Sequence, residues 1–375
     1  DLPSAALATD VVELGGLADM STTDLQKALT GKRVSLSPSI NAYNETLNGS
    51  STVKDLETML QLNYLYFTAP RRDETAYQTL MSILESQLAN RDKNPKAAWS
   101  DSVQMMASDH SDRTIILNKE LLTKVSLDKA LEVYKTRFAN PADFIFFFVG
   151  NVDPADKAFQ TQVCTWLGGL KTCKKLETAA DDKVRVSLGK NQNYFTRQME
   201  TKTASNRIQY TSYDMPYTLA NDLNMEMIGR ILSTRYLESI REREGGSYGV
   251  GCAGYVMQDP IEQAVLLMQF DTDPEKQEKL MSIIHKEVME IVENGPRADD
   301  LQKAKESRLS SLAEDMETNS WWGTILNRYY QDGINYAKDY KKTLEKVNAK
   351  SIQKTLKALV KQGNVVEVVM TPAAE

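Results

Sequence analysis

The side chains best suited to chemistry in this chain of 375 residues are Arg241 and Tyr248, which lie on either side of a glycine pair. Tyr248 can donate its phenol proton, and Arg241 carries a permanent planar cation that can hold a carbonyl oxygen. Gly245 and Gly246 allow a sharp turn, so that an arginine at a helix end and a tyrosine at a strand start can converge. Such fixed donors stabilise negative charge on a carbonyl oxygen under attack, commonly by about 3 to 4 kcal/mol per donor.

A purely structural interpretation of the same two residues is also open. Arg241 could complement the partial negative charge at the C-terminus of a helix. Tyr248 could be an ordinary aromatic residue of a strand. The helices and strands predicted around Arg241 and Tyr248 are therefore needed to choose between the catalytic and the structural interpretation.

The two histidines, His110 and His285, do not form a metal-binding pattern. Neither has a second histidine near it in the sequence, whereas catalytic zinc is held by three protein ligands and a water. We therefore interpret both as structural or solvent-exposed, and we expect no metal site in this chain. The sequence also contains no G-x-S-x-G, Gly-rich phosphate loop or reactive-cysteine motif, which excludes most other enzyme classes.

The three cysteines, Cys164, Cys173 and Cys252, are too few for a disulfide scaffold and lack the C-x-x-C spacing of a metal site. We expect buried or free thiols. A bridge between Cys164 and Cys173 across the turn 167–170 stays open, and it would indicate an oxidising compartment. For this reason a periplasmic location is favoured over a cytoplasmic one.

The composition is that of a globular protein, with 41% hydrophobic residues, 26% charged residues and a formal net charge of -6. Charges of both signs are interspersed, so we expect no nucleic-acid partner. The most apolar short run, residues 144–149, has the length of one buried strand, well below the roughly 18 residues of a membrane span, so no membrane insertion is expected. The chain begins at Asp1 without a Met or a signal peptide, and we expect that whatever came first was removed.

Arg241 ends a run of apolar residues at helical spacing, which predicts one long helix over 218–241. A strand over 205–213 is predicted before it, and strand-forming residues at 247–256 and 264–270 predict a hairpin after it. Asp273-Pro274 then predicts the start of a second helix that ends at Asn294-Gly295, and a third helix is expected to begin near Asp299.

The first half of the chain repeats this order. Helical patterns are predicted over 2–14 and 73–89, with a strand over 34–47 and a strand or helix over 52–67. Both halves also end alike. A helix over 127–138 precedes the strand 144–149, just as a helix over 352–360 precedes a strand over 365–370, and this repetition indicates an internal duplication.

The predicted fold class is α+β, with two homologous two-layer domains that each have a mostly antiparallel sheet and helices packed on one face. The polar segment 178–192 is typical of a linker, so the domains are placed at 1–185 and 193–375. Because no strand precedes the helix 2–14, whereas 205–213 precedes 218–241, the first domain is expected to lack one or two N-terminal strands. A cut from a larger polypeptide and an incompletely built domain both stay open.

With these elements in place, the Arg241 to Tyr248 segment and the repeated domain ending resemble the non-catalytic C-terminal half of the pitrilysin and insulin-degrading-enzyme (insulinase) family of inverted zinc metallopeptidases. The resemblance implies two halves that close like a clamshell around a chamber. It implies that Tyr248 and Arg241 bind the substrate carbonyl and stabilise the transition state. It also implies zinc in the complete enzyme, held by an H-x-x-E-H motif that this sequence lacks, so the chain alone is expected to be inactive.

Three functions follow from this resemblance. The first is the C-terminal half of a zinc metalloendopeptidase, which binds peptide substrates and needs an N-terminal half that carries the zinc. The second is a non-catalytic subunit that pairs with a zinc-bearing partner subunit. The third is a non-enzymatic scaffold of the same fold. A predicted helix with Trp321-Trp322 and Tyr329-Tyr330 could line the chamber, but packing in the core is the favoured interpretation.

Overall fold

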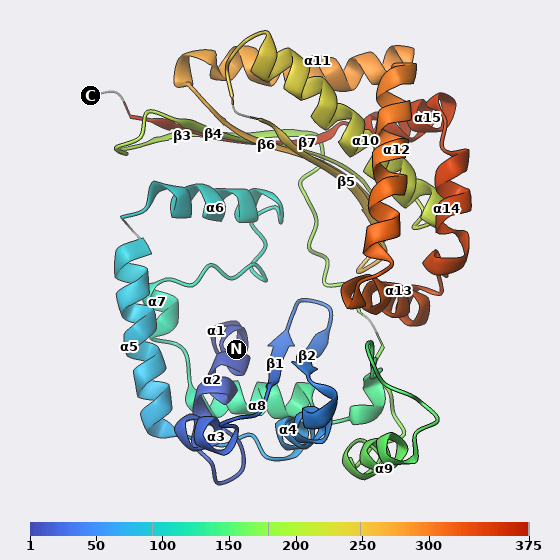
Figure 1. The fold of residues 1–375 in the computed structure, drawn as a ribbon. Coiled ribbons are helices and arrows are strands. Elements are labelled where there is room, and N and C mark those ends of the chain that lie inside the picture. The colour runs from blue at the N-terminus through green and yellow to red at the C-terminus, as the bar shows by residue number, and fades with distance from the viewer. Residues whose placement is uncertain (92, 179, 248, 374–375) are drawn as a thin grey trace. The chain divides into compact units, whose positions relative to one another are not determined.

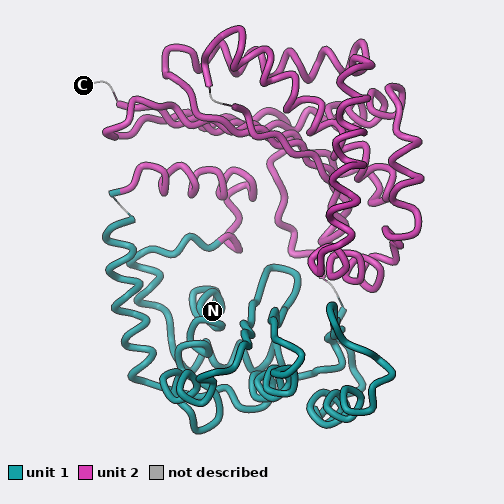
Figure 2. Tube along the Cα trace, viewed as in Figure 1, with its two compact units in different colours: residues 1–93, 115–179 teal, residues 94–114, 180–375 magenta. Residues whose placement is uncertain are grey.

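The computed structural model describes residues 1–91, 93–178, 180–247 and 249–373 (Figure 1). The chain forms two compact units, one of residues 1–93 and 115–179 and the other of residues 94–114 and 180–375 (Figure 2). Each unit combines a β-sheet with helices, which confirms the predicted α+β class.

The second unit is built on a five-stranded sheet in the order β3-β7-β4-β6-β5 (Figure 1). All neighbours are antiparallel except β3 and β7, which run parallel. This agrees with the predicted mostly antiparallel sheet. The strands are β3 (Lys190–Arg197), β4 (Ala204–Ser212), β5 (Gly251–Met257), β6 (Gln263–Thr272) and β7 (Asn364–Pro372).

One face of this sheet carries the main core of the second unit. The central helix is α10 (Leu219–Tyr236), in which Leu223, Ile228 and Ile231 are buried at helical spacing. The helix α11 (Gln277–Asn294) begins after a short 3-10 helix that is capped by Asp273, as the sequence predicted. The remaining helices are α12 (Ala298–Asp315), α13 (Asn319–Asp332), α14 (Tyr336–Lys346) and α15 (Ala349–Lys361).

Two glycines bring α10 unusually close to β5. A Cβ on Gly254 would lie 2.2 Å from the carbonyl oxygen of Met225, and a Cβ on Gly229 would lie 2.8 Å from the amide nitrogen of Gly254. Side chains at these two positions would therefore push the helix off the strand. The close contact fixes the direction in which α10 leads to Arg241.

The opposite face of the sheet is covered by α6 (Pro95–Met106), a helix from the first half of the sequence. Trp99 is 8% exposed and packs with Val368 and Met370 of β7. Lys96 adds an ion pair with both carboxylate oxygens of Asp271, at 2.8 and 2.9 Å. The sequence did not predict this helix or the sheet face that it covers.

The first unit has a two-stranded sheet, β1 (Val34–Ile40) and β2 (Glu45–Ser51), so the single strand predicted over 34–47 is a hairpin. The segment 52–67, predicted as strand or helix, is mostly the helix α4. The helices of this unit are α1 (Leu2–Ala6), α2 (Ala8–Gly15), α3 (Thr22–Ala28), α4 (Leu56–Thr68), α5 (Glu74–Arg91), α7 (Lys119–Leu122), α8 (Leu127–Arg137) and α9 (Lys157–Trp166).

The predicted strand 144–149 is wrong as far as the described residues show, because this segment pairs with no strand there. Its counterpart β7 lies between β3 and β4, which satisfy its backbone on both sides. The described part of the first unit offers no such neighbours to 144–149. High strand propensity alone therefore does not produce a strand here.

The predicted linker 178–192 overlaps the start of β3, because Lys190 already pairs with Val365 of β7. The alternating polar residues of an edge strand resemble a linker in sequence. Contacts also group 94–114 with the second unit. The predicted domains, 1–185 and 193–375, follow the internal duplication, whereas the two compact units follow contacts in space. The predicted boundary between the domains therefore stays a prediction.

Candidate functional site

Arg241 lies in a π-helical turn, Leu237–Glu242, that continues α10. Together the two segments confirm the long helix predicted over 218–241. The Arg241 side chain is exposed, and among the described residues it has no hydrogen-bond or ion-pair partner. The guanidinium of Arg241 is therefore not neutralised by any described carboxylate.

Tyr248 lies outside the described residues, so the predicted approach of Arg241 and Tyr248 stays a prediction.

The glycine pair ends the helix as the sequence indicated. The amide of Gly245 donates to the carbonyl oxygen of Arg241 at 3.1 Å, and the amide of Gly246 donates to that of Ile240 at 3.2 Å. Gly245 has a φ of 54°, a left-handed conformation that favours glycine. Gly246 is buried, and a Cβ there would lie 2.7 Å from Leu280 Cδ1. The left-handed backbone at Gly245 and the tight space at Gly246 therefore both favour glycine in the turn.

Side chains from β6 and from Lys276, the residue just before α11, hold the segment 244–247. Lys276 Nζ donates to the carbonyl oxygens of Glu244 and Gly245, each at 3.3 Å. Thr272 Oγ1 donates to the carbonyl oxygen of Gly246. Ser247 Oγ donates to the carbonyl oxygen of Asp271 at 2.7 Å. The segment that leads from Arg241 towards position 248 is therefore fixed to the sheet at several points.

Charged groups also surround the C-terminal end of α10. Arg235 is 4% exposed, and its Nε lies 2.7 Å from Glu287 Oε2. Arg297 donates to Glu238 Oε2 at 3.0 Å. Burial raises the pKa of the Asp300 carboxyl, and the nearby Arg297 cation offsets only part of this. These pairs stabilise the helix end that presents Arg241.

His285 takes part in a polar cluster around the buried Glu367, on the face of the sheet that carries the main core. Tyr210 OH lies 2.6 Å from His285 Nδ1, and His285 Nε2 lies 2.9 Å from Glu367 Oε1 without the alignment of a hydrogen bond. Glu367 also accepts hydrogen bonds from Tyr194 and Gln192. These contacts agree with the structural role predicted for His285.

Glu367 is a feature that the sequence interpretation missed. It is 1% exposed on β7, and burial alone would raise its pKa. The contacts with His285, Tyr194 and Gln192 outweigh burial and lower the pKa of Glu367 to about 2. A lone acid in a run of valines was the signal that could have indicated a buried charge.

The described residues do not fit a zinc site. No group of three or more His, Cys, Asp or Glu side chains among them is arranged to hold a metal ion. His285 contacts only one carboxylate, Glu367, and its other ring nitrogen faces Tyr210. An open catalytic zinc site needs three protein ligands. Any zinc chemistry would therefore have to come from outside these residues.

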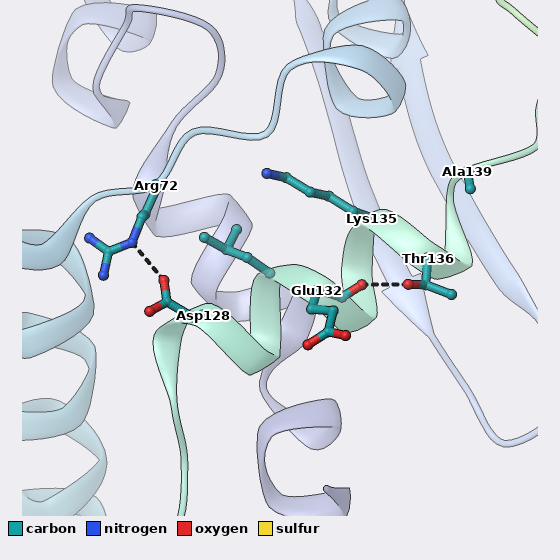
Figure 3. Close-up of a pocket in the computed structure, with 7 residues that line it drawn as sticks. Arg72, Asp128, Glu132, Lys135, Thr136 and Ala139 are labelled. Atoms are coloured by element: carbon teal, nitrogen blue, oxygen red, sulfur yellow. Dashed lines mark hydrogen bonds and ion pairs between the residues drawn. The ribbon is translucent and has the colours of Figure 1, made fainter.

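A shallow depression of about 510 Å³ lies along α8 in the first unit (Figure 3). Arg72 Nε donates to Asp128 Oδ1 at 2.7 Å there, so this cation is already paired. None of the predicted site residues contributes to it. The depression is lined by Arg72, Asp128, Leu131, Glu132, Lys135, Thr136 and Ala139.

The aromatic residues of α13 divide into two groups. Trp321 packs edge-on against Tyr340 and joins the core, as the favoured interpretation predicted. Trp322, Tyr329 and Tyr330 are 38%, 47% and 57% exposed, so that interpretation is wrong for these three. The helix has only one face against the core, and three aromatic side chains lie off that face.

Cys164 and Cys173 are exposed and carry free thiols, so the bridge that the sequence left open is not formed in this structure. Burial raises the pKa of the Cys252 thiol, which suits an inert core residue. Among the described residues, no helix is long and apolar enough to cross a lipid bilayer.

Residues 124–308 match the family model described as the Peptidase M16 inactive domain. The chain is 22% identical over 340 residues to "Zinc protease PQQL-like" of Arabidopsis thaliana, and 23% identical over 337 residues to "Probable zinc protease PqqL" of Escherichia coli (strain K12). Each match covers 87% of this chain and 35% of the relative. The chain thus spans about a third of the length of these relatives.

The fold is similar to that of the periplasmic protease PqqL from Escherichia coli, with a TM-score of 0.81 and 19% identity over 98% of this chain and 41% of that one. Together with the family match, this confirms the resemblance to inverted zinc peptidases that was drawn from the sequence. It also confirms the assignment to the non-catalytic half.

Proposed function

We propose that this chain, whose residues 124–308 match the Peptidase M16 inactive domain, is the non-catalytic half of a peptidase of that family, and that it binds peptide substrates and assists their hydrolysis. The zinc site belongs to an N-terminal half that lies elsewhere. The chain alone is inactive. Its named relatives are zinc proteases more than twice as long, which supports a zinc half on the same polypeptide rather than on a partner subunit.

The observation that carries this proposal is the exposed, unpaired cation of Arg241 on a firmly held helix end. Among the described residues no carboxylate neutralises it, whereas Arg235, Arg297 and Arg308 all have acidic partners. Arg241 is instead available to a ligand with a carbonyl or an oxyanion.

In the proposed mechanism, Arg241 and Tyr248 act on the carbonyl oxygen of the bond to be cleaved. Attack on the carbonyl carbon places negative charge on that oxygen. The Arg241 guanidinium and the Tyr248 phenol donate to it, and the charge is stabilised more in the transition state than in the bound substrate. The fixed segment 244–247 connects the helix end that carries Arg241 with the position of the second donor. A zinc ion held by the other half would supply the activation of the attacking water.

We also place this activity in the periplasm. One relative of similar fold is a periplasmic protease.

The test compares variants of the complete peptidase, including its zinc half. Arg241→Lys and Tyr248→Phe are each expected to lower kcat by roughly 100-fold or more with little change in KM, because donors to the oxyanion act mainly in the transition state. Arg243→Lys is the matched control, since Arg243 is an exposed neighbour outside the proposed pair. Unchanged turnover in both site variants would leave the fold as a scaffold without a catalytic role.

A further inference from the structure

Residues 336–361, which form α14 and α15, are strongly basic in an otherwise acidic chain. They contain eight lysines and two acidic residues, Asp339 and Glu345, whereas the whole chain has a formal net charge of -6. All eight basic residues are lysines, and none is an arginine. Positive charge is therefore concentrated on two consecutive helices, and the remaining residues carry a larger negative excess than the whole chain.

The lysines of α15 form one stripe along the helix. They are spaced by four, three and four residues, and this spacing places them on a single face. The buried residues Ile352, Leu356 and Leu359 lie on the opposite face and pack in the main core of the second unit. The exposed stripe consists of Lys350, Lys354, Lys357 and Lys361.

The helix α14 repeats this arrangement. Its buried residues Tyr336, Tyr340 and Leu344 pack in the same core. The lysines again lie on the side of the helix that faces away from these residues. They are Lys338, Lys341, Lys342 and Lys346, and all are exposed. These eight lysines of α14 and α15 together are the lysine face.

The charges of the lysine face have no partners within the described part of the chain, which includes all of 336–361. None of the eight ε-amino groups forms an ion pair or a hydrogen bond there. Lysines of the neighbouring helices are paired, Lys279 of α11 with Glu244 and Lys303 of α12 with Asp299. The lysine face therefore keeps its charge available to an external anion.

Hydrogen bonds from neighbouring helices hold α14 and α15 in place. Lys305 Nζ of α12 donates to the carbonyl oxygens of Glu345 and Val347, each at 2.8 Å, where α14 ends. Gln353 Nε2 of α15 donates to the carbonyl oxygen of Glu293 at 2.8 Å. The backbone that carries the lysine face is therefore already ordered before any partner binds.

The form of the lysine face selects among anionic partners. Side chains on the outer side of a helix diverge, whereas a site for a small anion needs polar groups that converge. Interfaces with proteins are depleted in lysine and enriched in arginine and aromatic residues. Single-stranded nucleic acids stack on exposed aromatic rings, but Tyr336 and Tyr340 are buried. A lipid surface with anionic headgroups requires none of these features, because it presents many mobile charges to many separate cations.

We propose that the lysine face of α14 and α15 binds the protein to membranes whose surface carries anionic headgroups. The apolar sides of both helices are buried in the core, so binding takes place at the level of the headgroups and inserts neither helix into the bilayer. The inference concerns where the protein is held and does not depend on the proposed peptidase function.

Binding to lipid vesicles tests the proposal in the complete peptidase. Vesicles of phosphatidylglycerol and phosphatidylcholine in equal amounts should bind the protein at least about tenfold more tightly than vesicles of phosphatidylcholine alone. Raising the salt concentration from about 0.01 M to about 0.5 M should abolish this difference, because salt screens the attraction. Equal binding to the two kinds of vesicle at low salt overturns the proposal.

A variant of α15 assigns the binding to the lysine face. Glutamine removes the charge but is a good helix former, so the helix is retained. Because each lysine near an anionic surface contributes to binding, the loss of four should weaken binding to the phosphatidylglycerol vesicles by about 100-fold or more. The variant combines Lys350→Gln, Lys354→Gln, Lys357→Gln and Lys361→Gln.

A matched variant of the first unit controls for total charge. It removes the same number of exposed lysines and is expected to change vesicle binding by less than about threefold. Both variants should keep the urea unfolding midpoint of the parent protein, which shows that they are folded. Equal weakening of vesicle binding by the two variants overturns the proposal. The control combines Lys54→Gln, Lys157→Gln, Lys171→Gln and Lys174→Gln.

Two soluble polyanions separate a lipid surface from the other macromolecular partners. At the same concentration of negative charge, the protein should bind duplex DNA and polyglutamate more weakly than it binds the phosphatidylglycerol vesicles. Tighter binding to either polymer identifies a nucleic acid or an acidic protein as the partner and overturns the proposal.

Discussion

The ammonium group of Lys276 lies 3.3 Å from the carbonyl oxygen of Gly245 and equally far from that of Glu244. These carbonyls follow the last turn of the long helix, where backbone acceptors have no partners within the helix. A lysine at the start of α11 therefore provides the donor. It ties the second helix of the unit to the turn that carries the chain from Arg241 towards position 248.

Replacing Lys276 should loosen this turn without unfolding the unit. Lys276→Met keeps the length of the side chain but removes both hydrogen bonds, which contribute about 1 kcal/mol each. We expect faster amide exchange at residues 245–249 and, in the complete peptidase, a lower kcat. Lys286→Met, an exposed lysine on the same helix, is the control and should change neither. Exchange rates that match the control would contradict an anchoring role for Lys276.

The close contact of α10 with β5 gives a second prediction. Gly254→Ala forces a Cβ to within 2.2 Å of the Met225 carbonyl oxygen, so helix and strand must separate. Overpacking of this kind costs about 1 to 3 kcal/mol. Gly251→Ala on the same strand meets only an ordinary contact at 3.6 Å and should be tolerated. Urea unfolding of the two variants compares the costs directly, and similar midpoints would refute the close packing.

The helix α6 gives a third prediction, at Trp99. Trp99→Ala should destabilise the second unit by about 3 to 5 kcal/mol, because it removes a buried ring from the β7 face. Trp99→Phe should cost much less, since the indole N–H has no hydrogen-bond partner among the described residues. Limited proteolysis within 94–114 should accelerate for Trp99→Ala alone. Equal cleavage of both variants would show that packing of this ring does not hold α6.

The sequence predicted the elements whose signals are local. The spacing of apolar residues in α10, the capping by Asp273 and the glycine stop after Arg241 each depend on neighbours within a few turns. For the same reason the place of Arg241 at a helix end was predictable. The duplication also emerged from the order of such elements.

The missed features depend on residues far apart in sequence. α6 packs on strands that follow it by about 100 to 270 residues, and nothing near Trp99 indicates which sheet it covers. The first residues of β3 lie within the predicted linker 178–192, because only pairing with β7 distinguishes an edge strand from a polar loop. The anchoring of Gly245 by Lys276 likewise joins two segments that share no sequence pattern. In each of these three features, contacts between distant segments determine the structure, and local propensity does not.

Glu367 and its neighbours give the last prediction, because a buried carboxylate links stability to pH. Its pKa is about 2 in the folded chain against an ordinary value of 4.5. The folded state therefore favours the ionised form, and the contribution is fully present above pH 4.5 and is lost as the pH falls towards 2. The shift corresponds to about 3 kcal/mol.

Glu367→Gln should remove this dependence. At pH 7 we expect the variant to be less stable by about 2 to 3 kcal/mol, since an amide cannot reproduce the contacts that the carboxylate makes with His285 and with the donors Tyr194 and Gln192. The difference from the parent protein should shrink as the pH falls from 5 towards 2, because the parent then loses its own carboxylate. Glu293→Gln, at an exposed glutamate of α11, is the matched control. Urea unfolding at pH 7, 5 and 3 measures the difference, and a gap that stays constant with pH would mean that the Glu367 carboxylate is not the group responsible.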